Sequence, residues 1–280
     1  MEEQNNILEV KNLSVHFGHE PDLVKAVDDV SFHIGRGETV ALVGESGSGK
    51  SISALTLTKL APRAARYAGG QVLFNGVDLL RLNDTELRRI RGSQISYIFQ
   101  EPMVSFNPVF TIGWQISEAL KLHRRGIDRS SEVARLLELV QLPHRMEAAY
   151  PHQMSGGQLQ RCMIAMALAC SPELLVADEP TTALDVTVQR EILNLLAELR
   201  EKVGLSVLMI THNFGIVSDL ARRVYVMQNG RLVEEGPTRR ILDAPSHDYT
   251  RQLMAAVPRL HPRQRTGLGA KDAGQEEELG

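Results

Sequence analysis

The sequence predicts an α/β fold with a central parallel β-sheet, an N-terminal antiparallel β-subdomain and an inserted α-helical subdomain. Apolar and polar residues alternate in short runs through residues 7–34, which is typical of antiparallel strands with one buried face. Residues 39–43 (TVALV) form an almost unbroken apolar run, as in a parallel strand that is covered on both faces. Between residues 102 and 170 the apolar residues follow helical spacing instead. A mostly helical segment therefore interrupts the sheet.

The individual elements follow in order along the chain. The expected antiparallel strands are residues 7–10, 13–17 and 24–34. The expected buried strands are residues 39–43, 95–99, 174–177 and 206–211. Asn75-Gly76 and Asn229-Gly230 are typical of tight hairpin turns, which end the strands expected at residues 71–74 and 224–227. The expected helices are residues 52–60, 112–123 and 130–140, the last with a Ser-Ser-Glu cap.

Composition narrows the function classes. The chain has 280 residues and a formal net charge of −3, which argues against a general nucleic-acid-binding protein. No apolar run approaches the roughly 20 residues of a transmembrane helix, and the polar start MEEQNN does not resemble a signal peptide.

Cys162 and Cys170 are expected on one helix, roughly 12 Å apart, and therefore unable to form a disulfide. Residues 259–280 lack apolar content and are expected to be a disordered tail or a linker.

A phosphate-binding motif follows the strand at residues 39–43. Residues 44–51 (GESGSGKS) fit the pattern G-x-x-x-x-G-K-[ST], with a strand before and a helix after. Backbone N–H groups of such a loop surround phosphates, the lysine reaches the β- and γ-phosphates, and the final hydroxyl is a ligand of Mg²⁺. We therefore expect a nucleoside triphosphate, with Mg²⁺, at Gly44, Ser46, Gly47, Gly49, Lys50 and Ser51.

Polar side chains follow three other buried strands. Gln100 follows residues 95–99, Asp178-Glu179 follows residues 174–177, and His212 follows residues 206–211. Ligands of open parallel sheets bind beyond the carboxyl ends of the strands, so we expect these side chains near the phosphate loop. Asp178 would hold Mg²⁺ with Ser51, and Gln100 would bind either the metal or the attacking water. Glu179 would activate the water and His212 would donate to the γ-phosphate, which predicts hydrolysis of the γ-phosphate.

A second anion-binding helix start lies at residues 155–158 (SGGQ). Ser155, Gly156, Gly157 and Gln158 open a helix whose free N–H groups and positive dipole end would favour a phosphate. One chain would then carry two phosphate sites.

Taken together, these motifs resemble the ATP-binding subunits of ABC transporters. GESGSGKS, FQEP, SGGQ, LLVADEP, TTALD and TH occur in that family's order, and the match extends over about residues 7–258. The resemblance implies a P-loop NTPase (RecA-like) core over residues 1–258, with the helical subdomain inserted at about 102–170. It also implies that two ATPase domains pair head to tail, so that residues 155–158 close over ATP held by the partner. Asp185 corresponds to the family's D-loop and Phe17 to an aromatic residue that stacks on adenine.

A narrower resemblance concerns the ATPases of dipeptide, oligopeptide, glutathione and nickel importers. The stretches FQEPMVSFNPVFTIGWQI, DEPTTALDVTVQ and APSHDYTRQLMAAVP carry it. It implies two membrane-spanning permease subunits, a periplasmic solute-binding protein, and a peripheral position on the cytoplasmic face of the inner membrane. The helical insertion would receive the permeases. Because no cysteine follows Cys170, we expect no iron–sulfur cluster of the kind that some relatives carry.

Some features depart from the importer pattern. Asn213 stands where these importers usually have aspartate, and Phe106 where they usually have leucine.

The alternative function is a soluble ABC-type ATPase that acts on nucleic acid or the ribosome. Such proteins usually have two ATPase domains or a long coiled-coil insertion and a basic face, whereas this chain has one ATPase domain and a net charge of −3.

Overall fold

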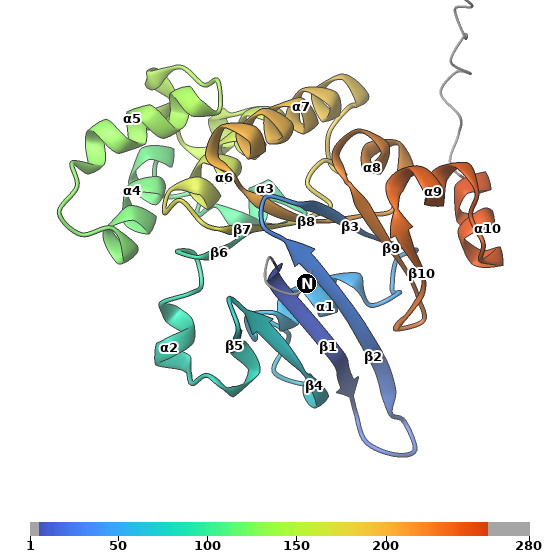
Figure 1. Ribbon diagram of the computed structural model, residues 1–280. Coiled ribbons are helices and arrows are strands. Elements are labelled where there is room, and N and C mark those ends of the chain that lie inside the picture. The colour runs from blue at the N-terminus through green and yellow to red at the C-terminus, as the bar shows by residue number, and fades with distance from the viewer. Residues whose placement is uncertain (1–5, 257–280) are drawn as a thin grey trace, which may run out of the picture.

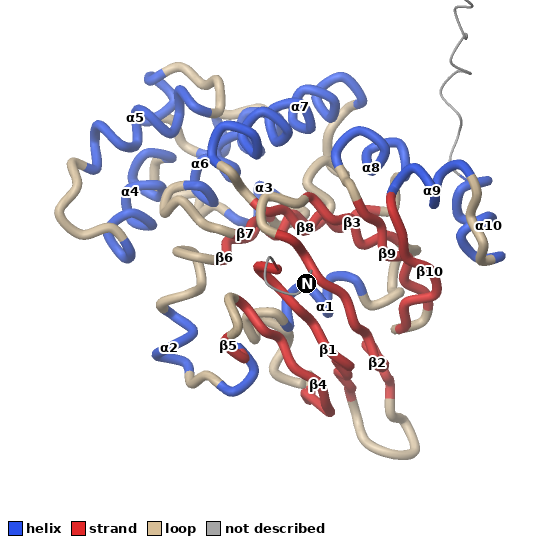
Figure 2. Tube along the Cα trace, in the orientation of Figure 1, coloured by secondary structure: helices blue, strands red, loops and turns tan. Residues whose placement is uncertain are grey.

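The computed structural model describes residues 6–256, and Figure 1 shows their arrangement. The tail predicted at residues 259–280 lies outside the described residues. The structure confirms the predicted fold class, with an antiparallel sheet beside a mostly parallel central sheet (Figure 2).

The N-terminal sheet has the strand order β2-β1-β4-β5 and is antiparallel throughout. Its strands are β1 (Asn6–Phe17), β2 (Val24–Gly35), β4 (Arg66–Phe74) and β5 (Val77–Asp78). The two strands predicted within residues 7–17 form one strand. The polar pair that appeared to separate them is a bulge, in which Asn12 has φ 49° and the register against β2 shifts between Val10 and Leu13.

The central sheet has the order β10-β9-β3-β8-β7-β6, and only β10 runs antiparallel to its neighbour. Its strands are β3 (Thr39–Val43), β6 (Ile95–Ile98), β7 (Leu174–Asp178), β8 (Ser206–Thr211), β9 (Arg223–Gln228) and β10 (Arg231–Pro237). β3 and β8 have the predicted bounds, and all their residues are buried. Neighbouring parallel strands end at the same edge, which places the residues that follow them side by side.

The helices surround the central sheet. They are α1 (Lys50–Thr56), α2 (Asp84–Arg88), α3 (Pro102–Ser105), α4 (Ile112–His123), α5 (Arg129–Leu139), α6 (Gly156–Leu168), α7 (Val186–Val203), α8 (Phe214–Leu220), α9 (Thr238–Asp243) and α10 (Asp248–Ala256). The part of the chain that the structure describes also has the short 3₁₀ turns η2 (Leu79–Arg81), η3 (His144–Ala148) and η4 (Pro151–Gln153). No helix among the described residues combines the length and the apolar character that a bilayer crossing requires.

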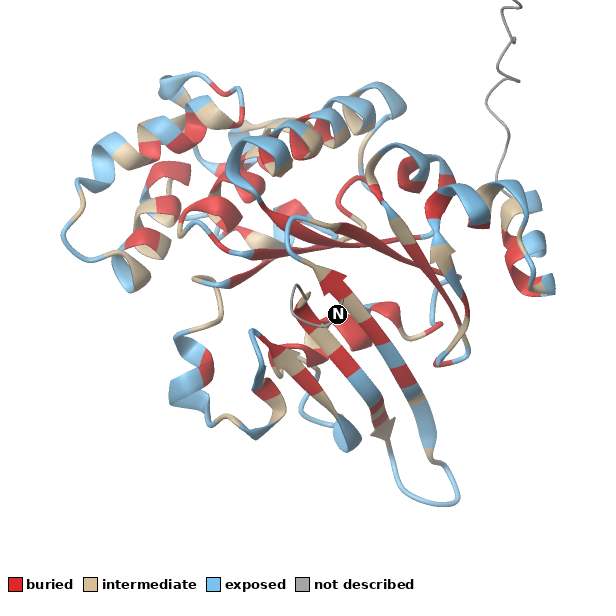
Figure 3. Cartoon of the chain, in the orientation of Figure 1, coloured by how far each residue is buried: buried red, intermediate tan, exposed pale blue. Residues whose placement is uncertain are grey.

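Alternate residues of β8 show which layer covers which face of the sheet. Leu208 and Ile210 pack in a cluster with α1 and the antiparallel sheet, whereas Val207 and Met209 pack with α4 to α7. The buried residues of the central strands therefore lie between two layers, as Figure 3 shows. Helices α1 and α6, which begin at the two predicted phosphate sites, cover opposite faces.

Three local predictions were wrong. Helix α1 begins at Lys50, because Gly49 in the left-handed region is its N-cap, and it already ends at Thr56. Helix α5 begins at Arg129, and Asp128 replaces the predicted Ser-Ser-Glu cap by accepting the N–H of Ser130 at 3.1 Å. Cys170 lies beyond the end of α6 rather than on it.

Candidate active site

The phosphate loop leaves β3 at Val43 and enters α1 at Lys50. It passes so close to two neighbouring strands that only glycine fits at two positions. A Cβ atom on Gly44 would lie 2.2 Å from the carbonyl oxygen of Met227, and one on Gly49 would lie 2.2 Å from that of Ala26. Both glycines have positive φ, 157° and 103°. The loop is therefore fixed against β2 and β9 before any ligand binds.

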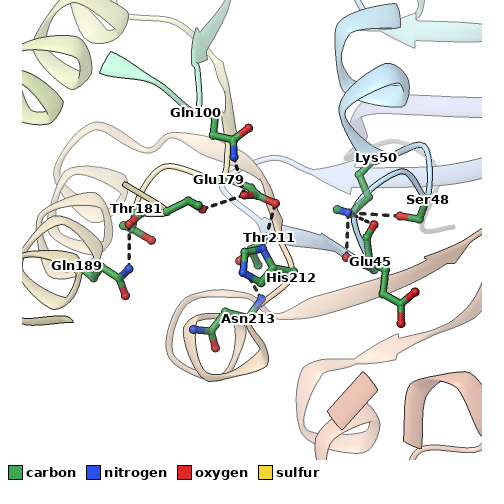
Figure 4. Close-up of polar contacts among 12 residues, drawn as sticks. Glu45, Ser48, Lys50, Gln100, Glu179, Thr181, Gln189, Thr211, His212 and Asn213 are labelled. Atoms are coloured by element: carbon green, nitrogen blue, oxygen red, sulfur yellow. Dashed lines mark hydrogen bonds and ion pairs between the residues drawn. The ribbon is translucent and has the colours of Figure 1, made fainter. Parts of the chain in front are cut away.

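Lys50 folds back over this loop. Its Nζ donates to the carbonyl oxygens of Gly44 and Glu45 at 2.9 and 2.7 Å, and to Ser48 Oγ at 3.3 Å (Figure 4). The side chain is only 5% exposed. Burial lowers the pKa of Lys50, and the nearby Glu179 and Asp178 carboxylates oppose this by favouring the charged ammonium. The structure thus places a shielded cation inside the loop.

Glu179 is the centre of a hydrogen-bonded group at the carboxyl ends of three strands. Its Oε2 accepts from Gln100 Nε2 at 3.0 Å and from Thr182 Oγ1 at 2.8 Å, and its Oε1 lies 3.1 Å from His212 Nδ1. Figure 4 shows the side chains of Gln100 and His212 converging on this carboxylate. The structure therefore brings together the three residues that the sequence predicted to be catalytic.

The same contacts set the charge of Glu179. Burial alone would raise its pKa, but hydrogen bonds from His212 and Thr182 and the charge of Lys50 outweigh it and hold the pKa below its usual value. The backbone is also unusual, because Glu179 has φ 46°. Non-glycine residues in this region often occur at functional sites. The result is an ionised carboxylate held in one orientation.

Asp178 is the last residue of β7. Burial raises its pKa, which Ser51 and Lys50 partly offset. Within the described part of the chain, its Oδ1 atom is buried and has no hydrogen-bond partner. A buried carboxylate oxygen without a partner is costly unless a ligand completes it.

The second predicted phosphate site is the start of α6. Ser155 and Gln158 form a capping box: Ser155 Oγ accepts the N–H of Gln158 at 3.3 Å, and Gln158 Oε1 accepts the N–H of Ser155 at 3.0 Å. Ser155 and Gly156 are exposed. No hydrogen bond between residues that the structure describes joins this helix start to the phosphate loop.

Comparisons with known proteins identify the family. Residues 27–182, more than half of the chain, match the family described as "ABC transporter", and residues 233–279 match "Oligopeptide/dipeptide transporter, C-terminal region". The chain belongs to the ABC transporter family. It is an ATP-binding subunit and an ATPase.

Two curated relatives show how close the similarity is. The chain is 47% identical over 258 residues to a probable peptide ABC transporter ATP-binding protein, y4tR, of Sinorhizobium fredii, covering 90% of this chain and 77% of that protein. It is also 47% identical over 268 residues to the glutathione import ATP-binding protein GsiA of Salmonella choleraesuis. That match covers 92% of this chain but only 43% of GsiA, so the chain spans less than half the length of that relative.

Solved structures agree with the fold. The dimeric ATP-binding cassette MJ0796, in a post-hydrolysis state bound to ADP and Pi, superposes with a TM-score of 0.74 at 30% identity, covering 83% of this chain and 99% of that one. The CbiO1 protein of Clostridium perfringens, part of an ABC transporter complex, gives 0.73 at 26% identity, covering 91% and 97%.

The loop between β7 and α7 of this ABC ATPase contains two contacts that the sequence analysis missed. Thr182 bonds Glu179 through its hydroxyl, and Gln189 Nε2 donates to the carbonyl oxygens of Thr181 and Leu184 at 2.9 and 3.0 Å. The sequence could have indicated the first contact, because Thr182 places a hydroxyl three residues after Glu179. The loop that orients Glu179 is therefore held at both ends.

The remaining predicted ligand residues lie in three different environments. Asp185 is the N-cap of α7, where its Oδ1 accepts the N–H groups of Thr187 and Val188 at 3.1 and 3.0 Å. Phe17 ends β1 and packs, partly buried, against the cluster beneath the antiparallel sheet. Ser46 and Gly47 are exposed at the tip of the phosphate loop.

Proposed function

We propose that this chain is the ATP-hydrolysing subunit of a membrane importer for peptides or a related small solute. The convergence of Gln100 and His212 on the ionised Glu179, beside a complete phosphate loop, is the observation that carries the proposal. The names of y4tR and GsiA support the transport class and the solute class. The same relatives favour the importer over the soluble alternative that acts on nucleic acid or the ribosome.

In this proposal ATP binds at the phosphate loop, through Gly44, Ser46, Gly47, Gly49, Lys50 and Ser51. The backbone N–H groups surround the phosphates, and Lys50 exchanges its present carbonyl partners for phosphate oxygens. Phe17 would stack on the base.

The residues at the end of β7 fit a Mg²⁺ ion. Among residues 6–256, Asp178 Oδ1 is a buried hard oxygen without a hydrogen-bond partner, and Ser51 adds a hydroxyl. Asp178, Ser51 and Gln100 would hold the ion, which when bound neutralises phosphate charge.

Hydrolysis would then depend on Glu179. Its pKa lies below the usual value, so the carboxylate is ionised near neutral pH, and in that form it would accept a proton from an attacking water. Gln100 and Thr182 fix one carboxylate oxygen, and His212 fixes the other while its exposed ring donates toward the γ-phosphate.

The second phosphate site belongs, in this proposal, to a partner ATPase domain, identical or related. Helices α1 and α6 cover opposite faces of one chain, so Ser155, Gly156, Gly157 and Gln158 would act on ATP held by the other chain, with Asp185 at the same interface. The dimeric state of MJ0796 supports this arrangement.

An exposed apolar surface on the helical insertion would contact the membrane-spanning permease subunits, of which the transporter would have two for its pair of ATPase domains. This surface consists of Val104, Val109, Phe110 and Trp114, with the last two rings stacked 4.0 Å apart. The chain would thus sit on the cytoplasmic face of the inner membrane, and a periplasmic solute-binding protein would act indirectly.

Purification of the native complex from detergent-solubilised membranes tests this function. The wild type should be recovered with membrane-spanning subunits, and Val109→Asp should reduce that recovery. Val24→Asp, which adds the same charge to an exposed valine of the antiparallel sheet, is the control. Recovery with ribosomes or DNA and no membrane subunit would refute the proposal.

A further inference from the structure

The C-terminal helix α10 contacts the phosphate loop directly. The hydroxyl oxygen of Tyr249 accepts the backbone N–H of Glu45 at 3.0 Å, across 204 residues of sequence. Glu45 is the second residue of the phosphate loop, between Gly44 and Ser46. None of the proposed catalytic roles uses this contact.

The ring of Tyr249 is fixed by apolar packing. It is 6% exposed and belongs to a cluster that includes Ala41 and Val43 of β3 and Phe214 of α8. Val43 is the residue from which the phosphate loop leaves the sheet. The hydroxyl therefore reaches the loop from a ring that packs against the strand supporting it.

The segment before α10 is anchored to the sheet by Glu234 of β10. The Glu234 carboxylate accepts hydrogen bonds from the N–H and the hydroxyl of Ser246, both at 2.7 Å, and from the N–H of His247 at 3.1 Å. Arg251 donates to the carbonyl oxygens of Pro245 and Ser246 at 3.0 and 2.9 Å. Burial would raise the pKa of Glu234, but the hydrogen bonds that its carboxylate accepts lower it to about 2, so the anchor is ionised under ordinary conditions.

We propose that Tyr249 is a positioning residue for nucleotide binding, through which the C-terminal segment holds the phosphate loop in its binding conformation. The backbone of Glu45 is held at two points, by Tyr249 at its N–H and by Lys50 at its carbonyl oxygen. When Lys50 turns to phosphate, Tyr249 keeps the N–H of Glu45, and the Ser48 N–H keeps its carbonyl oxygen at 3.2 Å. This role rests on the nucleotide function proposed for the loop.

Tyr249→Phe tests the role, because it removes the hydroxyl and keeps the ring in its apolar cluster. Losing one such hydrogen bond should weaken ATP and ADP binding by about 3- to 10-fold. The KM for ATP should rise by a similar factor. The kcat at saturating ATP should stay within about 2-fold, because the bond orders the loop and no hydrogen bond between described residues joins Tyr249 to Glu179.

Tyr225→Phe is the matched control, since Tyr225 is also buried and its hydroxyl bonds His33 of β2 instead of the loop. It should lose comparable thermal stability without losing nucleotide affinity. Glu234→Gln, which loosens the anchor, should shift ATP affinity in the same direction as Tyr249→Phe. Hydrogen exchange adds a second readout: ATP should slow exchange in residues 248–256 of the wild type, and less so in Tyr249→Phe.

Lys50→Ala separates the two proposals. If Lys50→Ala abolishes nucleotide binding while Tyr249→Phe binds like the wild type or Tyr225→Phe, the positioning role is wrong and the proposed function stands. If Lys50→Ala binds ATP normally, the loop is not the nucleotide site and both proposals are wrong.

Discussion

Replacing Glu179 by glutamine should stop hydrolysis with little effect on folding or ATP binding. An amide can occupy the carboxylate's place: its oxygen would accept from Gln100 and Thr182, and its NH₂ group would donate to His212 Nδ1. The change removes one proton acceptor and keeps the three contacts. We expect a cost in stability below about 1 kcal/mol, because the lost charge assistance is partly offset by the smaller desolvation of a neutral group.

The effect on rate should be much larger. A positioned general base contributes roughly 10²- to 10⁴-fold, which is about 2.7 to 5.5 kcal/mol of transition-state stabilisation. Single-turnover release of phosphate from bound ATP measures this step, and nucleotide titration measures affinity separately. Under the proposed pairing, the variant should also remain dimeric in ATP, as judged by size-exclusion chromatography with light scattering.

Thr182→Val is the matched control for Glu179→Gln. It removes one hydrogen bond to the carboxylate and keeps the base, so hydrolysis should fall only about 3- to 10-fold. The base assignment would be wrong if Glu179→Gln hydrolysed ATP at more than one-tenth of the wild-type rate. A loss of ATP affinity beyond about 10-fold would instead show that Glu179 has a mainly structural role.

Three further predictions concern helix α6 and the Glu234 anchor of the C-terminal segment. Ser155→Ala should lose about 1 kcal/mol of stability with the N-cap and also most hydrolysis, whereas Asp128→Ala should lose a similar cap and keep hydrolysis in a phosphate-release assay. Gly157→Ala should destabilise by about 1 to 3 kcal/mol in urea unfolding, because its Cβ would lie 2.6 Å from Val188 Cγ1, and Val188→Ala should rescue it. Glu234 has a lowered pKa of about 2, so its stabilisation is complete above the unfolded value of 4.5 and is lost as pH falls toward 2. Glu234→Gln should therefore cost about 3 kcal/mol at pH 7 and roughly half of that at pH 3, and a difference that does not change with pH would contradict the anchor.

The local sequence pattern predicted the bounds of an element correctly where its burial in the fold, or the residue that caps it, matches the pattern. Strands β3 and β8 have the predicted bounds because they are buried on both faces, and α4 has them because Thr111 caps its start. The start of α1 was misplaced because Gly49, in the left-handed region, caps the helix without any side chain that marks its start.

The sequence predicted the part of the candidate site that lies at the ends of the parallel strands, because the sheet topology determines which of these residues meet. The rule that ligands bind beyond parallel strand ends was sufficient to group Gln100, Glu179 and His212, although 112 positions separate the first from the last. The contact between Glu45 and Tyr249 follows no such rule. It depends on how α10 packs against β3 and α8, which is a tertiary outcome that no local sequence pattern encodes.

The placement of α6 gives a physical reason for the second phosphate-binding helix start. A capping box already satisfies Ser155 and Gln158, and the helix covers the face of the sheet opposite to the one that α1 covers. If the N–H groups at the starts of α1 and α6 competed for one phosphate within a chain, the second set would add little affinity. If the two sets come from different chains, both can bind the same nucleotide, and the nucleotide becomes part of the interface. Binding of ATP would then be linked to dimer formation, and cleavage of the γ-phosphate would remove the group that both chains contact. In such a design Glu179 sets the lifetime of the closed dimer, and Tyr249 sets how readily each loop accepts ATP before closure.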